Sequence, residues 1–141
     1  MNYISIDGDD VGRKITSYYL SNNGNELKNL SLSLKFSTEA ISSHLSDKGF
    51  VVLFCAADGV VASIESDPDF TILFNTISKL SPIGVTYSAG VGDSLREAYI
   101  ALMSAKSNGK GCLHMYSALV DTNTDTDTDT DTDTDTDNSY V

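Results

Sequence analysis

The chain has 141 residues, the length of one domain, and a formal net charge of −11. The aspartates of one tract, DTNTDTDTDTDTDTDTD at 121–137, contribute eight negative charges, and the tract has no apolar residue. We expect this tract to be disordered, and predict a folded domain at 1–118 with an acidic tail at 119–141. Residues 1–120 have no basic stripe, which argues against binding to duplex nucleic acid.

Hydropathy and cysteine content indicate the compartment. No apolar stretch approaches the length of a membrane span, and a charged loop follows the first strand directly. We therefore expect a cytoplasmic protein without membrane insertion. Cys55 and Cys112 lie in apolar runs, and we expect both to be small buried side chains in a reducing compartment.

The first predicted elements are a strand at 2–6 and a helix that starts within 11–21. The turn-rich NNGNE at 22–26 is expected to interrupt this helix. Residues 30–48 fit two patterns, because LSLSLKF alternates like a strand while the apolar residues also follow helical spacing. We predict a helix there, from about 32 to 46.

The middle of the chain, at 49–66, is its most strand-like part. The apolar runs FVVLFC and VVASIE flank Ala56-Ala57-Asp58-Gly59, and Asp-Gly between two hydrophobic runs is a strong hairpin signal. We predict two antiparallel strands joined by a tight turn.

The second half predicts two more helices and two more strands. A helix at 68–80 opens near a proline and has one apolar face. A strand at 83–91 follows, then a helix within 94–111 that begins with a serine cap and ends at Gly109, then a strand at 112–116. The order β α α β β α β α β predicts an α+β fold of the ferredoxin-like kind. Its antiparallel sheet contains a central hairpin, and its helices pack mainly on one face.

The loop after the first strand concentrates negative charge, with Asp7, Asp9 and Asp10 within four residues. Asp and Gly are ordinary turn residues, so a plain turn explains the pattern. A cation site explains it too, since neighbouring carboxylates repel unless they are protonated or share a cation.

The predicted topology favours the cation site. If the first strand pairs with the hairpin, Asp7 and Asp58 meet at one edge of the sheet, and Gly8 offers a carbonyl. Two such carboxylates suit Mg²⁺ or Mn²⁺ in phosphoryl or nucleotidyl transfer. The amides of Asp10 and Val11, at a helix start, face phosphate oxygens in this hypothesis. Lys106 and Lys110, one helical turn apart, take the remaining phosphate charge.

Four motifs in order resemble the palm-domain nucleotide cyclases: YISIDGDDVGR, FCAADGVVA, GVTYSAGVG and AYIALMSAKSNGKG. This group includes the GGDEF diguanylate cyclases and the polymerase subunit of type III CRISPR complexes. The chain is most similar to the minimal CRISPR polymerase of anti-phage operons, over residues 2 to about 116.

The resemblance implies roles for individual residues. Asp7, Gly8 and Asp58 match metal-binding positions, with both aspartates catalytic. Asp9 and Asp10 belong to the family's loop, without a direct metal contact. The positions expected to bind nucleotide or phosphate are Gly8, Asp10, Val11, Gly12, Ala56, Ala57, Lys106 and Lys110.

The chain also departs from the family. Alanines replace both turn glycines, and Gly59 replaces the second acid, which leaves fewer metal ligands. The base-contacting residues of diguanylate cyclases are absent, and their slots hold Gly12, Ile15 and Thr16. The resemblance therefore favours ATP and an adenine product.

Three hypotheses follow. The leading one is a metal-dependent nucleotidyltransferase that makes a cyclic oligoadenylate, by resemblance a cyclic dinucleotide made by a homodimer and read by a membrane-associated effector. The second is a degenerate palm that binds a nucleotide or second messenger without turnover, motivated by the substituted turn. The third is a ferredoxin-like interaction domain without ligand, in which Lys106 is an ordinary cation at a helix C-terminus.

Overall fold

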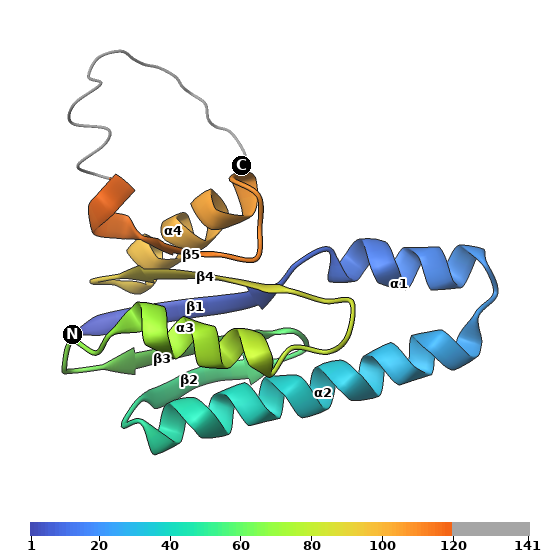
Figure 1. The fold of residues 1–141 in the computed structure, drawn as a ribbon, viewed down its shortest axis with the longest axis horizontal. Coiled ribbons are helices and arrows are strands. Elements are labelled where there is room, and N and C mark those ends of the chain that lie inside the picture. The colour runs from blue at the N-terminus through green and yellow to red at the C-terminus, as the bar shows by residue number, and fades with distance from the viewer. Residues whose placement is uncertain (120–141) are drawn as a thin grey trace, which may run out of the picture.

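A computed structural model describes residues 1–119; the predicted tail lies outside the described residues from residue 120 on. The described elements follow the predicted order (Figure 1): β1 (Asn2–Gly8), α1 (Val11–Leu20), α2 (Gly24–Asp47), β2 (Val51–Ala56), β3 (Gly59–Ile64), α3 (Phe70–Lys79), β4 (Tyr87–Gly92), α4 (Leu95–Ser107) and β5 (Leu113–Met115). None of the helices among residues 1–119 is long and apolar enough to cross a membrane.

The five strands form one sheet in the order β2-β3-β1-β4-β5. The first four pair antiparallel, and with α2 and α3 they form the ferredoxin-like unit that the element order predicts. The added strand β5 pairs parallel with β4, which requires a crossover connection, and α4 supplies it.

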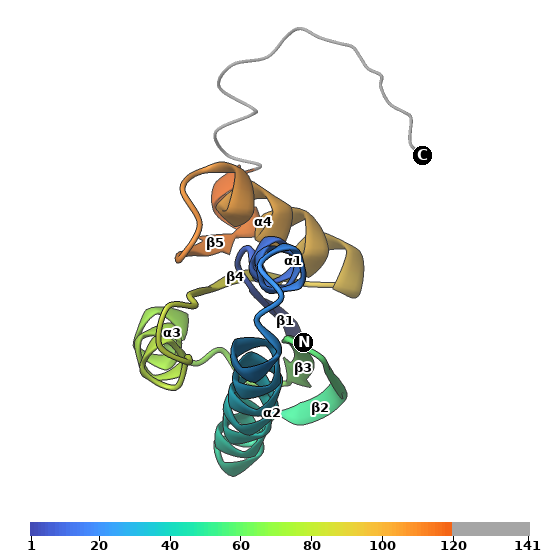
Figure 2. The ribbon, with the colours of Figure 1, turned by 90° about the vertical axis from the view of Figure 1, so that its right-hand side faces the viewer.

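The main core lies between one face of the sheet and the helices α2 and α3 (Figures 1 and 2). Alternate residues of β1, β3 and β4 point into it, as the two-residue period of a strand requires. The largest of its fully buried side chains are Ile4, Ile6, Ile41, Leu45, Val60, Ile77, Tyr87 and Val91.

The opposite face carries α4, which packs closely on β4. A Cβ on Gly90 would lie 2.1 Å from the Leu102 nitrogen, and one on Gly92 would lie 2.4 Å from the Glu97 Cβ. Glycine at these positions lets the helix backbone approach the strand. Two helices thus share the predicted face, and α4 covers the other.

The helix predicted at 32–46 begins eight residues earlier, at Gly24, so the predicted interruption at 22–26 is only a short turn. Asn23 caps α2, because its side-chain oxygen accepts a hydrogen bond from the Glu26 nitrogen at 3.2 Å. The first half of α2 extends beyond the sheet and packs against α1 (Figure 1) through a second small core that includes Leu30, Leu34, Val11 and Val85.

Two other boundaries differ from prediction. The strand expected at 83–91 begins only at Tyr87, because a turn in which the Val85 nitrogen donates to the Pro82 carbonyl precedes it. The helix expected to end at Gly109 ends at Ser107.

The expectation of a buried thiol is wrong for Cys55, which is exposed because β2 is an edge strand. Cys112 is half-buried, and both cysteines are free thiols.

Candidate active site

The structure brings Asp7 and Asp58 together at the end of β1. Asp7 pairs with Gly59 of β3, and the Gly8 nitrogen donates to the Asp58 carbonyl at 3.0 Å. The Asp7 carboxylate lies over Gly59, and the Asp58 carboxylate lies over Gly8. A Cβ on Gly59 would lie 3.3 Å from Asp7 Oδ1, and one on Gly8 would lie 3.1 Å from Asp58 Oδ2.

The electrostatics of Asp7 reflect this crowding. Burial and then the charge of Asp58 raise the pKa of Asp7, and the neighbouring Lys106 opposes the rise. The site therefore holds the ionised Asp7 carboxylate at a cost that an added cation would relieve.

Lys106 already places one cation among these oxygens. Its Nζ donates to the Gly8 carbonyl at 2.8 Å and to Asp9 Oδ1 at 3.0 Å, and it lies 3.2 Å from Asp7 Oδ2. Burial alone would lower the pKa of Lys106, but the carboxylates of Asp9 and Asp7 raise it above its usual value. The oxygens around this ammonium are hard donors of the kind that Mg²⁺ and Mn²⁺ prefer, so the residues fit a divalent cation.

Asp9 is the most heavily bonded carboxylate of the site. Besides Lys106, it accepts hydrogen bonds from Thr86 Oγ1 at 2.7 Å, Ser88 Oγ at 2.8 Å and the Gly111 nitrogen at 2.9 Å. Burial raises its pKa, but these hydrogen bonds outweigh it and hold the pKa below its usual range. Asp9 thus joins the loop after β1 to β4 and to the loop after α4, a role that the DGDD pattern alone does not reveal.

Lys110 does not share a helix with Lys106, contrary to prediction. It lies three residues beyond the end of α4 with a φ of 63°, and its Nζ donates to Asp10 Oδ1 at 2.6 Å. The hydrogen bond from Lys110 lowers the pKa of Asp10. Asp10 occupies the N-cap position of α1 without a side-chain capping hydrogen bond, and the helix starts at Val11, where the phosphate-facing amides were expected.

Within the described residues, no third side chain joins Asp7 and Asp58 as a metal ligand, and Asp9 is taken up by its hydrogen bonds. Among residues 1–119, no group of three or more His, Cys, Asp or Glu side chains is arranged to hold a metal ion. A divalent cation here would need further oxygens, such as the Gly8 carbonyl and the phosphates of a nucleotide, which is the usual way in which Mg²⁺ is bound.

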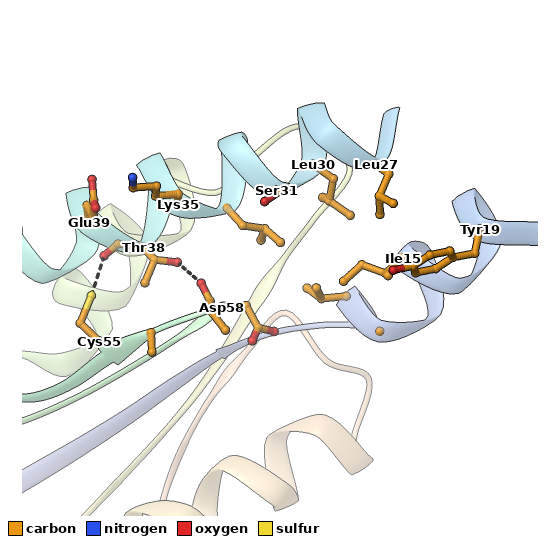
Figure 3. A pocket seen from close by; sticks show the side chains of 15 residues that line it. Ile15, Tyr19, Leu27, Leu30, Ser31, Lys35, Thr38, Glu39, Cys55 and Asp58 are labelled. Atoms are coloured by element: carbon orange, nitrogen blue, oxygen red, sulfur yellow. Dashed lines mark hydrogen bonds between the residues drawn. The ribbon is translucent and has the colours of Figure 1, made fainter. Parts of the chain in front are cut away.

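A pocket of about 690 Å³ opens beside Asp58, between α1, α2 and the β2–β3 hairpin (Figure 3). Of the predicted nucleotide-binding residues, Val11, Gly12, Ala56 and Ala57 line it. Figure 3 shows side chains of α2 pointing toward α1, with Thr38 facing the hairpin. Sequence reasoning missed the α2 wall: Leu27, Leu30, Ser31, Leu34, Lys35, Thr38 and Glu39. The helical spacing of the leucines could have predicted this wall, but the same leucines also alternate with serine as in a strand.

The hairpin turn is strained and is held by α2. Ala57 and Asp58 form its two central residues, and Ala57 has a φ of 52°, a left-handed conformation that favours glycine. Thr38 Oγ1 donates to the Ala57 carbonyl at 3.1 Å. This hydrogen bond joins the pocket wall to the turn that carries Asp58.

Comparison with known proteins agrees with this geometry. Residues 3–116 match the family model of the minimal CRISPR polymerase domain. No curated protein matches the chain.

Three solved structures with the same fold are GGDEF-type domains. The active GGEEF domain of a diguanylate cyclase from Vibrio cholerae is 18% identical with a TM-score of 0.54, covering 82% of this chain and 81% of that one. The GGDEF domain of PA1120 (YfiN or TpbB) from Pseudomonas aeruginosa is 12% identical with a TM-score of 0.56. The match covers 81% of this chain and 80% of that one. The GGDEF domain of DgcB from Caulobacter crescentus, solved in complex with c-di-GMP, is 8% identical with a TM-score of 0.58. The match covers 82% of this chain and 77% of that one. At these identities the likeness establishes the palm fold.

Proposed function

The chain belongs to the minimal CRISPR polymerase family, and from this premise we propose that it makes a cyclic oligoadenylate, most simply a cyclic dinucleotide, from ATP as a signal in anti-phage defence. Its family and fold make it a palm domain of the nucleotide polymerase and cyclase kind. One observation carries the proposal: Asp7 and Asp58 converge, with Lys106 beside Asp7, and Asp58 also lines the pocket between α1 and α2.

The pocket suits a nucleoside in size and chemistry. Its volume of about 690 Å³ lies in the range of small-molecule sites, and most of its wall is apolar. Gly12 and Ile15 line it at slots where diguanylate cyclases carry base-contacting polar residues, so a guanine would lose those hydrogen bonds. Ser31, Lys35 and Glu39 of α2 are the polar groups available to a base, and we propose that it is adenine.

Cations and amides beside the pocket would receive the triphosphate. Lys106 and Lys110 are paired with aspartates here and would turn to phosphate oxygens, while the amides of Asp10 and Val11 stand at the start of α1. Asp7, the Gly8 carbonyl and Asp58 would hold Mg²⁺ or Mn²⁺. When bound, such ions neutralise phosphate charge and acidify a ribose hydroxyl.

The reaction joins two nucleotides. A ribose hydroxyl oxygen of one ATP attacks the α-phosphorus of another, and the bond to the leaving pyrophosphate breaks. One site performs this displacement in one direction only. We therefore propose a homodimer that opposes two sites, in the cytoplasm, with the product read by a membrane-associated effector.

The test is incubation of the full chain with ATP or GTP and Mg²⁺ or Mn²⁺, with products resolved by mass and nuclease sensitivity. We expect a cyclic adenylate from ATP that is lost in Asp58→Asn. The matched control is Asp93→Asn, because Asp93 follows β4 at the opposite edge of the sheet and is exposed. Full product formation by Asp58→Asn would refute the proposal.

A second candidate is nucleotide binding without turnover. It is favoured by Gly59, which stands beside Asp7 where an acidic side chain would complete the metal site. It predicts that ATP raises the melting temperature of the protein while no pyrophosphate appears during long incubation.

A further inference from the structure

Tyr87 carries an unpartnered hydroxyl inside the protein. The residue pairs with Gly8 at the end of β1, and only 2% of its surface is exposed. Its hydroxyl is the one buried side-chain polar atom among residues 1–119 without a hydrogen-bond partner. An unpaired buried hydroxyl is costly, and a phenylalanine would fill the same space without that cost.

The groups around this hydroxyl belong to the active site. Burial raises the pKa of Tyr87, the neighbouring Thr38 hydroxyl opposes the rise, and the carboxylates of Asp58 and Asp7 add to it. Thr38 Oγ1 donates its hydrogen to the Ala57 carbonyl, and the Tyr87 hydroxyl has no partner at hydrogen-bond geometry. Tyr87 therefore lies beneath the hairpin turn as a donor without an acceptor.

Asp58 presents the complementary group. Its carboxylate lies over Gly8, the residue that pairs with Tyr87, so both side chains stand on the same part of the sheet. In the described part of the chain, the Asp58 carboxylate makes no hydrogen bond or ion pair, whereas the Asp7 carboxylate forms an ion pair with Lys106. An unpaired donor and an unpaired acceptor are thus neighbours.

We propose that Tyr87 is a positioning residue for Asp58, whose carboxylate accepts a hydrogen bond from the Tyr87 hydroxyl when Asp58 holds a divalent cation. The inference rests on the proposed function, because it requires Asp58 to be a ligand of a divalent cation. A carboxylate that ligates through one oxygen gains from a donor on the other, and phenol-to-carboxylate hydrogen bonds are short and strong.

The test measures Mn²⁺ binding to the full chain without nucleotide, from the paramagnetic resonance signal of free Mn²⁺, together with thermal unfolding of the metal-free protein. Tyr87→Phe removes only the hydroxyl. We expect it to weaken Mn²⁺ binding about 10-fold or more, the usual effect of losing a partner of a metal ligand. Its melting temperature without metal should be unchanged or higher, because an unpaired buried hydroxyl is removed.

The controls separate positioning from a structural role. Tyr99→Phe makes the same chemical change at a residue that is 58% exposed, and both readouts should stay as in the wild type. In an Asp58→Asn background, Tyr87→Phe should weaken Mn²⁺ binding no further. Wild-type Mn²⁺ affinity in Tyr87→Phe would overturn the inference while leaving the proposed function intact. Failure of the unmodified chain to bind Mn²⁺ without nucleotide would overturn the inference but not the proposed function, in which nucleotide phosphates complete the cation site.

Discussion

The Lys106 ammonium lies 3.0 Å from Asp9 Oδ1 and so joins the last turn of α4 to the loop after β1, across 97 positions of the chain. The Asp9 side chain is 3% exposed and that of Lys106 is 19% exposed. A carboxylate buried to this degree needs both a countercharge and hydrogen-bond donors, and Asp9 has both. The pair therefore orders the proposed phosphate-binding loop before any ligand arrives.

Loss of this countercharge should destabilise the fold. Lys106→Met keeps most of the side-chain stem but leaves Asp9 without its cation, and we expect a loss of about 3 kcal/mol in the free energy of unfolding. Urea denaturation measures it. Lys110→Met is the matched control, because its pair with Asp10 is exposed to solvent and should contribute much less to stability. Equal losses in the two variants would contradict the prediction.

The Asp9 network also predicts a pH dependence. Because hydrogen bonds lower the pKa of Asp9 in the folded state, its contribution to stability is present above the unfolded pKa of about 3.8 and is lost as the pH falls through the lower folded pKa. The stability difference between the wild type and Asp9→Asn should be constant from pH 5 to pH 8 and shrink below about pH 4. Urea unfolding at several pH values tests this; a constant difference down to pH 2 would refute it.

The ionised Asp7 carboxylate should affect folding stability in the opposite direction to that of Asp9. Burial and the charge of Asp58 raise its pKa, so the ionised carboxylate opposes folding at neutral pH. Asp7→Asn should raise the free energy of unfolding at pH 7 by about 0.5 kcal/mol, a small value because the side chain is 39% exposed and solvent screens it. The same variant should lose product formation. A less stable Asp7→Asn protein at pH 7 would show that the Lys106 contact outweighs the repulsion.

The turn offers a comparison of two adjacent alanines. Ala57→Gly removes a Cβ from a residue with a φ of 52° and should stabilise the protein by about 0.5 kcal/mol, since relief of strain exceeds the added chain entropy. Ala56→Gly, at the end of β2, should destabilise it by about 0.5 to 1 kcal/mol. Thermal unfolding of both variants distinguishes them, and a shift of the same sign in both would refute the strain.

Gly90→Ala should separate α4 from the sheet. The new Cβ would lie 2.1 Å from the Leu102 nitrogen, so the helix would have to move, at a cost of about 3 kcal/mol or more. Gly12→Ala is the contrasting change, because nothing lies within 4 Å of a Cβ there and alanine favours helix by about 1 kcal/mol. The far-ultraviolet dichroism and urea midpoint of each variant provide the readouts.

Much of the fold was predictable from local patterns. The alternating runs around Ala56–Gly59 predicted the hairpin, and the serine cap and periodic apolar residues of 94–107 predicted α4. The start of α2 was missed because Asn23 and Gly24 are ordinary turn residues. Glu26, three residues after Asn23, was the available signal of a helix start.

By itself, the sequence determined the order of the elements, the acidic tract, and the pair of aspartates that a ferredoxin-like topology brings to one edge of the sheet. Only the tertiary structure decided what those residues contact. It placed Asp9 among donors from Thr86, Ser88 and Gly111, put the α2 wall beside Asp58, and left the Tyr87 hydroxyl unpaired beneath the turn. The physical reason is range: turns and helix periods depend on neighbours a few residues apart, whereas burial and charge pairing join residues that are distant in the chain.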